Sequence, residues 1–133
     1  MTAELHWLSL TAMAVALYWV PYILNRMASQ GILEAMRNTA ENETQPAAWA
    51  RRAQAAHGVA MENFPLFAAL ILAAHVTGVS NGVTAAAAPL YFFGMLAHYI
   101  VFTLGIPYVR TLAFLIAGFG AEMALALTLL GII

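Results

Sequence analysis

The stretch AAHGVAMENFPLFAALILAAHV, residues 55–76, decides the fold class of this chain. It is long enough to cross the hydrocarbon core of a bilayer, which needs about 20 mostly apolar residues. Its first half nevertheless contains His57, Glu62 and Asn63. We therefore predict a transmembrane helix that carries polar groups at membrane depth.

The composition of the whole chain supports a membrane protein. Of its 133 residues, 63% are hydrophobic and 8% charged, whereas soluble domains average roughly a quarter charged residues. The formal net charge of −1 gives no basic field, so we expect no nucleic-acid partner. The absence of cysteine excludes disulfides and a catalytic thiolate of the protein itself. The first residues lack the basic region of a signal peptide, so we expect the first apolar run to be retained.

Three further stretches have the length and apolarity of a span, at residues 7–24, 83–104 and 109–133. A short turn, TGVSNG (77–82), separates the second and third spans, and GIPYVR (105–110) contains the glycine and proline that end the third. We expect a single domain over 1–133, folded as an all-α, antiparallel bundle of four transmembrane helices. Pro46 can open the second helix, with Thr44 as a nearby cap, so that its first turns project from the bilayer.

The arginines predict the orientation of the chain. Four of the five cationic residues lie in the long connection over 26–54: Arg26, Arg37, Arg51 and Arg52. The fifth, Arg110, lies in the third connection, and the second connection has none. Since positive loops stay in the cytoplasm, we expect residues 26–54 on the cytoplasmic side and both termini on the other side.

Two carboxylates fall inside the predicted spans, where each costs about 2.5–3.5 kcal/mol on insertion scales. Glu62 is either a structural residue hydrogen-bonded between helices, or a contact for a ligand or an arginine. Glu122 lies midway along the fourth span beside Gly118 and Gly120, which permit close helix approach. We interpret Glu122 as a structural hydrogen bond at a helix or subunit interface.

Other polar residues also have two interpretations. A lone histidine near an interface, such as His57, is commonly a hydrogen-bonded structural residue, and His98 can pack with one interhelical hydrogen bond. Arg110 is either a snorkelling side chain or a fixed cation that stabilises an anion. His57, His98 and Glu62 could meet around a metal across two helices, but the sequence lacks the spacings of such sites, so we predict no metal.

Two stretches together resemble the MAPEG family, membrane-associated proteins in eicosanoid and glutathione metabolism. They are RRAQAAHGVAMENFPLF (51–67) and LAHYIVFTLGIPYVRTLAF (96–114), and the pattern is most similar to short bacterial members of that family. The resemblance implies a homotrimer of four-helix subunits in a bacterial inner membrane. It also implies that glutathione binds between neighbouring subunits, near the cytoplasmic ends of the helices.

The resemblance assigns expected roles to individual residues. Glu62 corresponds to the family's glutathione-contacting glutamate, Arg110 to the arginine that holds the thiolate, and Thr111 to the small hydroxyl beside it. Further candidate glutathione contacts are Arg26, Arg52, His57, Asn63 and His98. Arg110 and Thr111 are then the expected catalytic residues, because a guanidinium favours the thiolate, which is the nucleophile.

The chain also departs from the family pattern. The motif usually reads Arg-Ala-His-x-Asn-x-x-Glu-Asn, and here Ala55 and Val59 replace the arginine and the first asparagine. Phe102 and Phe114 stand where aromatic hydroxyls are often found. Positions 55, 59 and 62 share one helix face, and losing two charge-assisted contacts there would weaken glutathione binding by roughly a hundredfold or more.

Two hypotheses about function follow. The first is a non-catalytic membrane protein, a trimeric scaffold or an accessory subunit that joins other membrane subunits, with a degenerate glutathione site. The second is a glutathione-dependent transferase or peroxidase acting on lipophilic electrophiles that enter from the membrane lipid. A channel or transporter fits less well, since the spans lack discontinuous helices and a charged pore ring.

Overall fold

The computed structural model describes residues 1–36 and 46–133. Arg37 and Thr44, which entered the orientation and capping arguments, lie outside the described residues. In chain order the elements are α1 (Ala3–Leu17), α2 (Val20–Gln30), α3 (Ile32–Met36), α4 (Ala48–Thr77), α5 (Gly82–Leu104), α6 (Val109–Ala113), the π-helix η1 (Phe114–Phe119) and α7 (Gly120–Leu129).

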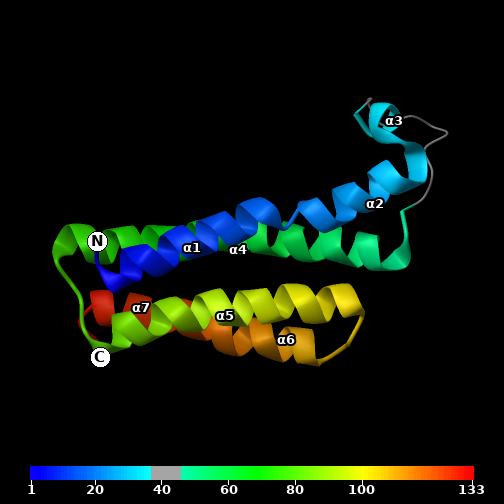
Figure 1. The fold of residues 1–133 in the computed structure, drawn as a ribbon. Helices are drawn as coiled ribbons and strands as arrows, with labels where there is room; N and C mark the ends of the chain where they lie inside the picture. The colour runs from blue at the N-terminus through cyan, green and yellow to red at the C-terminus, as the bar shows by residue number, and fades with distance from the viewer. Residues whose placement is uncertain (37–45) are drawn as a thin grey trace.

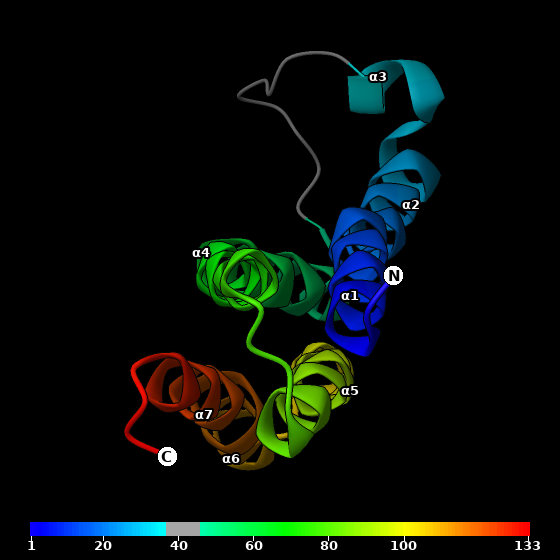
Figure 2. The same ribbon diagram turned by 90° about the vertical axis from the view of Figure 1, so that its left-hand side faces the viewer.

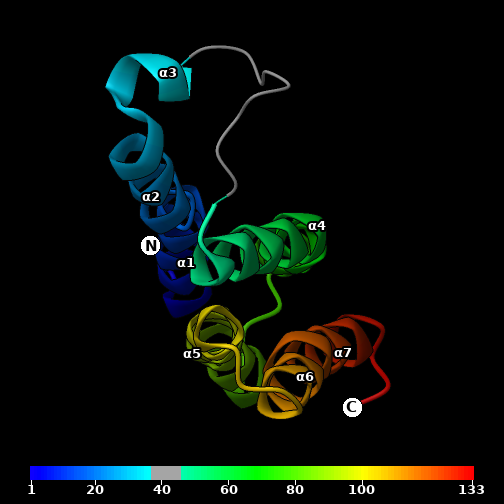
Figure 3. The same cartoon turned by 90° about the vertical axis from the view of Figure 1, so that its right-hand side faces the viewer.

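Within the described residues, four helical segments are long and apolar enough to cross a membrane: Ala3–Gln30, Ala48–Thr77, Gly82–Leu104 and Val109–Leu129. The expected all-α transmembrane fold is therefore confirmed. The segments run antiparallel, and both chain ends lie at the same end of the bundle as the α4–α5 connection (Figure 1). Viewed along its length, the bundle has α1, α4, α5 and α7 at its corners (Figure 2). At the opposite end, α3 rises away from the other helices (Figure 3).

The first span differs from the expected segment 7–24 because it is longer and is interrupted at Tyr18 and Trp19. Pro21 explains the interruption, since proline has no N–H to donate to the carbonyl of Leu17 and its ring crowds the preceding turn. The Tyr99 hydroxyl donates to the Tyr18 carbonyl oxygen at 2.8 Å. A side chain from α5 thereby replaces a backbone donor at the break.

Side chains satisfy the backbone at two helix starts. At the start of α4, two residues after Pro46, the Ala47 N–H donates to Asn25 Oδ1 on α2 at 3.3 Å. At the start of α5, Asn81 accepts from the backbone of Thr84 at 3.1 Å, and Thr84 accepts from the backbone of Asn81 at 2.9 Å. This reciprocal cap orients the short connection from α4.

Small and flat side chains bring the spans together. A Cβ atom added to Gly94 on α5 would lie 1.6 Å from the Cβ of Ala117 on η1, so the two helices approach through a glycine, as is common in membranes. Between α4 and α5, the rings of Phe67 and Tyr91 stack with centroids 3.9 Å apart. These contacts fix α5 against α4 and η1, which build the candidate site together with α6.

Candidate functional site

A pocket of about 240 Å³ lies near the end of α5, between α4, α5 and the start of the fourth span. Its lining residues are Val59, His98, Phe102, Arg110, Thr111 and Phe114. Three of them belong to the predicted site, namely His98, Arg110 and Thr111. The other three are positions where the chain departs from the family pattern.

The connection between α5 and α6 positions Arg110. Gly105 ends α5 with φ of 79°, and Tyr108 has φ of 65°, a conformation that non-glycine residues rarely adopt. These two residues reverse the chain, so that the first turn of α6 lies against the last turns of α5. The guanidinium carbon of Arg110 then lies 4.1 Å from the centroid of the Phe102 ring. The face of the Phe102 ring therefore holds the Arg110 guanidinium at the pocket.

His98 forms the buried wall of the pocket. Its side chain is 4% exposed, and its ring packs at 5.6 Å from Phe102 and 5.8 Å from Phe114, centroid to centroid. Its Nδ1 atom is buried and has no hydrogen-bond partner among the described residues. The interhelical hydrogen bond expected of His98 is thus not made by this atom.

The chemistry of the pocket suits an anion. Among the described residues lining it, none carries a carboxylate, while Arg110 supplies a permanent positive charge and Thr111 an exposed hydroxyl. A guanidinium is the side chain best suited to holding an anion at a partly apolar site. The volume is below the roughly 300–1,000 Å³ of small-molecule sites. The pocket of a single chain is therefore smaller than most small-molecule sites.

Glu62 does not line this pocket. It is exposed on the outer side of α4, next to Met61, which is 54% exposed, and near Leu66, which is 58% exposed. The only α4 side chain in the pocket is the half-buried Val59. Glu62 therefore does not join Arg110 in this pocket.

Three further candidates lie away from the pocket. Arg52 Nε donates to the carbonyl oxygen of Thr103 at 3.0 Å, at the end of α5, where glycine at position 105 leaves room for the guanidinium. His57 Nδ1 shares a hydrogen bond with the Tyr22 hydroxyl at 2.7 Å, which joins α4 to α2. Arg26 also lies on α2. Arg52 and His57 therefore hold helices together, as the structural interpretation of His57 predicts.

Asn63 belongs to a polar network between α4, α5 and α7. Tyr91 donates its hydroxyl to Asn63 Oδ1 at 2.7 Å, and Asn63 Nδ2 donates to Glu122 Oε2 at 3.3 Å. The expected interhelical hydrogen bond of Glu122 is confirmed. Its Oε1 is buried without a partner among the described residues. The sequence reasoning missed Tyr91, although its position seven residues before His98 places both on one face of α5.

Apolar helices that enclose polar groups at membrane depth define an integral membrane protein. The MAPEG family model matches residues 7–131. The chain therefore belongs to the MAPEG family. Neither the curated proteins nor the solved structures include one that matches it.

Proposed function

We propose that the pocket at Arg110 binds the thiolate of glutathione, and that the protein is a glutathione-dependent transferase or peroxidase acting on lipophilic electrophiles. The observation that carries the proposal is the meeting of Arg110, Thr111 and His98 in one pocket without a carboxylate among its described lining residues. Membership of a family associated with glutathione is consistent with it.

The residues present fit an anionic sulfur. Arg110 favours the thiolate over the thiol by its charge, and the low dielectric of the surrounding rings strengthens that effect. The Thr111 hydroxyl and the His98 ring can each donate a hydrogen bond to the anion. Glutathione would supply the sulfur nucleophile, while the protein orients it and excludes water with Phe102 and Phe114.

The exposed position of Glu62 supports a homotrimer with glutathione between subunits. A carboxylate facing lipid at this depth costs about 2.5–3.5 kcal/mol, and a neighbouring subunit that covers the outer side of α4 would remove that cost. The small volume of the pocket in one subunit also supports a binding site that is shared between subunits. In such an assembly Glu62 and Arg26 would contact the ligand from the neighbouring subunit.

The proposed setting is a bacterial inner membrane, with residues 26–54 in the cytoplasm and both termini on the other side. Reporter tags at each terminus test the orientation. If a tag at either terminus is found in the cytoplasm, the orientation predicted from the arginines is wrong.

A second candidate function is a non-catalytic trimeric scaffold or accessory subunit. It is favoured by Val59, Phe102 and Phe114, which line the pocket with apolar groups, and by the Phe102 ring that covers one face of the guanidinium. In that case the pocket would bind no glutathione. Native purification that yields a trimer without partner chains would remove support for the accessory-subunit version.

Calorimetric titration of the purified protein with glutathione separates the two functions. We expect binding by the wild type and a loss of affinity of roughly tenfold or more in Arg110→Ala. Arg51→Ala is a matched control, since Arg51 is an exposed arginine of α4 that does not line the pocket. If titration up to millimolar glutathione produces no heat, the proposed glutathione-dependent enzyme is refuted and the non-catalytic scaffold or accessory subunit is favoured.

A further inference from the structure

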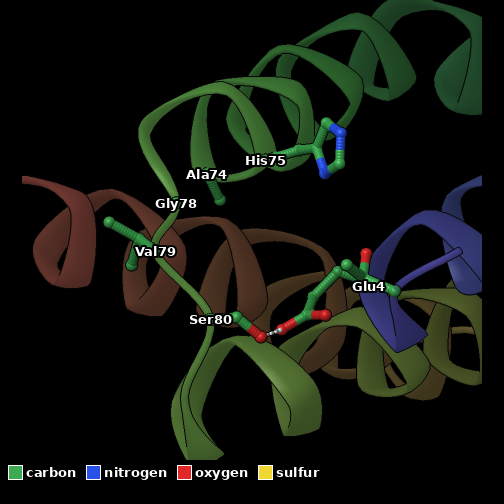
Figure 4. A pocket seen from close by; sticks show the side chains of 7 residues that line it. Glu4, Ala74, His75, Gly78, Val79 and Ser80 are labelled. Atoms are coloured by element: carbon green, nitrogen blue, oxygen red, sulfur yellow. Dashed lines mark hydrogen bonds between the residues drawn. The ribbon is translucent and has the colours of Figure 1, made fainter.

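A second cavity, of about 270 Å³, lies at the end of the bundle where the chain begins. It is enclosed by the first turn of α1, the last turn of α4 and the α4–α5 connection (Figure 4). Its lining residues are Thr2, Glu4, Ala74, His75, Gly78, Val79 and Ser80. None of them takes part in the site at Arg110.

The carboxylate of Glu4 is fixed at this cavity. Glu4 is 5% exposed, and its Oε1 accepts hydrogen bonds from the hydroxyls of Ser80 at 2.9 Å and Thr84 at 2.6 Å. Thr84 is fully buried. Both hydroxyls donate to the same oxygen of the carboxylate.

Among the described residues, no arginine lies beside the negative charge of Glu4. The chain has no lysine, and the described arginines lie in α2, in the first turn of α4 and at the start of α6, at the far end of the bundle (Figure 1). The two hydroxyl hydrogen bonds and the N-terminus of α1 stabilise the carboxylate, and the helix dipole supplies about half a charge. A cationic occupant of the cavity would stabilise it further.

We propose that this cavity binds a primary ammonium group, carried either by a phosphatidylethanolamine headgroup or by a small soluble amine. The ammonium has three N–H donors. Glu4 supplies the charged acceptor, and the Ser80 oxygen and a ring nitrogen of His75 supply the other two. The cavity is built from helix ends, which places it at the level of lipid headgroups. A quaternary ammonium has no N–H and leaves these acceptors unsatisfied.

Native mass spectrometry of the full-length protein from nanodiscs of equal phosphatidylethanolamine and phosphatidylcholine tests the lipid source. The wild type should retain phosphatidylethanolamine preferentially. Glu4→Gln keeps an oxygen for Ser80 and Thr84 but removes the charge, and should lower that preference roughly tenfold. Ser9→Ala is the control, at an exposed serine of α1 outside the cavity, and should retain it.

Calorimetry with ethanolamine in lipid-free detergent tests the soluble source, with the same loss expected in Glu4→Gln. Binding of ethanolamine without lipid preference assigns the site to a soluble amine. Equal binding by wild type and Glu4→Gln, or binding of neither probe by the wild type, overturns the proposal.

Two more variants cover the case in which Glu4→Gln does not fold. Ser80→Ala and His75→Ala alter exposed side chains of the cavity, and each should weaken ethanolamine binding roughly threefold or more. Unchanged binding in both variants would equally overturn the proposal.

Discussion

The guanidinium of Arg110 rests on the ring of Phe102, with 4.1 Å between the guanidinium carbon and the ring centroid. The contact joins the first turn of α6 to the last turns of α5 across the connection that reverses the chain. A cation–π contact contributes about 0.5–2 kcal/mol. Phe102 thus orients the cation at the pocket although it cannot itself hydrogen-bond to an anion.

Replacing the ring of Phe102 should disturb the proposed glutathione site. In Phe102→Leu the guanidinium loses its aromatic support, and we expect glutathione affinity to fall several-fold, in line with a contact of about 0.5–1 kcal/mol. Phe102→Tyr keeps the ring and should bind at least as tightly as the wild type. Calorimetric titration measures both. Tighter binding by Phe102→Leu would mean that the ring competes with the anion instead of positioning the cation.

The network of Tyr91, Asn63 and Glu122 should contribute strongly to stability. Asn63→Leu leaves the Tyr91 hydroxyl and the Glu122 carboxyl buried without their partner, so we expect a loss of about 1–3 kcal/mol in the free energy of unfolding. Tyr91→Phe keeps the ring stacked on Phe67 and should cost only about 0.6 kcal/mol. Thermal unfolding in detergent, followed by circular dichroism, compares the variants. Equal melting temperatures for Asn63→Leu and wild type would show that the network adds no stability.

The close approach of α5 and η1 makes Gly94 sensitive to substitution. In Gly94→Ala the new methyl would lie 1.6 Å from the Cβ of Ala117, and the overpacking should lower the free energy of unfolding by about 1–3 kcal/mol. The double variant Gly94→Ala with Ala117→Gly removes that Cβ and should recover part of the loss. A full recovery is not expected, because the Cα of Ala117 would still lie 3.1 Å from the new methyl. Additive losses in the double variant would contradict this account.

The hydrogen bond between Tyr22 and His57 should hold α2 against α4. In Tyr22→Phe we expect a global loss of only about 0.6 kcal/mol, but faster amide exchange in α2, which lies beyond the break at Tyr18 and Trp19. Hydrogen-exchange mass spectrometry locates the effect. Leu24→Ala, at an exposed position of the same helix, serves as a control. Exchange that rises equally in α2 and α5 would argue against a local role.

Much of the fold could be predicted because membrane insertion depends on local properties of the chain. The length and apolarity of residues 55–76 suffice for a span, since each span satisfies its own backbone hydrogen bonds. The same physics predicts that Glu122 must find a hydrogen bond inside the bundle. Pro21 is visible in the sequence as the cause of the helix break. The donor that satisfies the Tyr18 carbonyl at this break is the Tyr99 hydroxyl, which comes from another helix.

The composition of the pocket could be predicted only in part. Glu62 and Asn63 are neighbours in the sequence, yet Asn63 is drawn to Glu122 while Glu62 points outward. Successive side chains of a helix diverge by about 100°, and only the packing of α5 and α7 determines which one is enclosed.

The sequence by itself determined the membrane class, the spans and the family resemblance, because these depend on composition and on motifs within single helices. Tertiary structure alone decided that Val59, His98 and Arg110 share one pocket. It also decided that Glu4 is buried against Thr84. The physical reason is the same in both cases. A side chain acquires its partners from other helices, and the rotation of each helix is set by packing across the whole bundle.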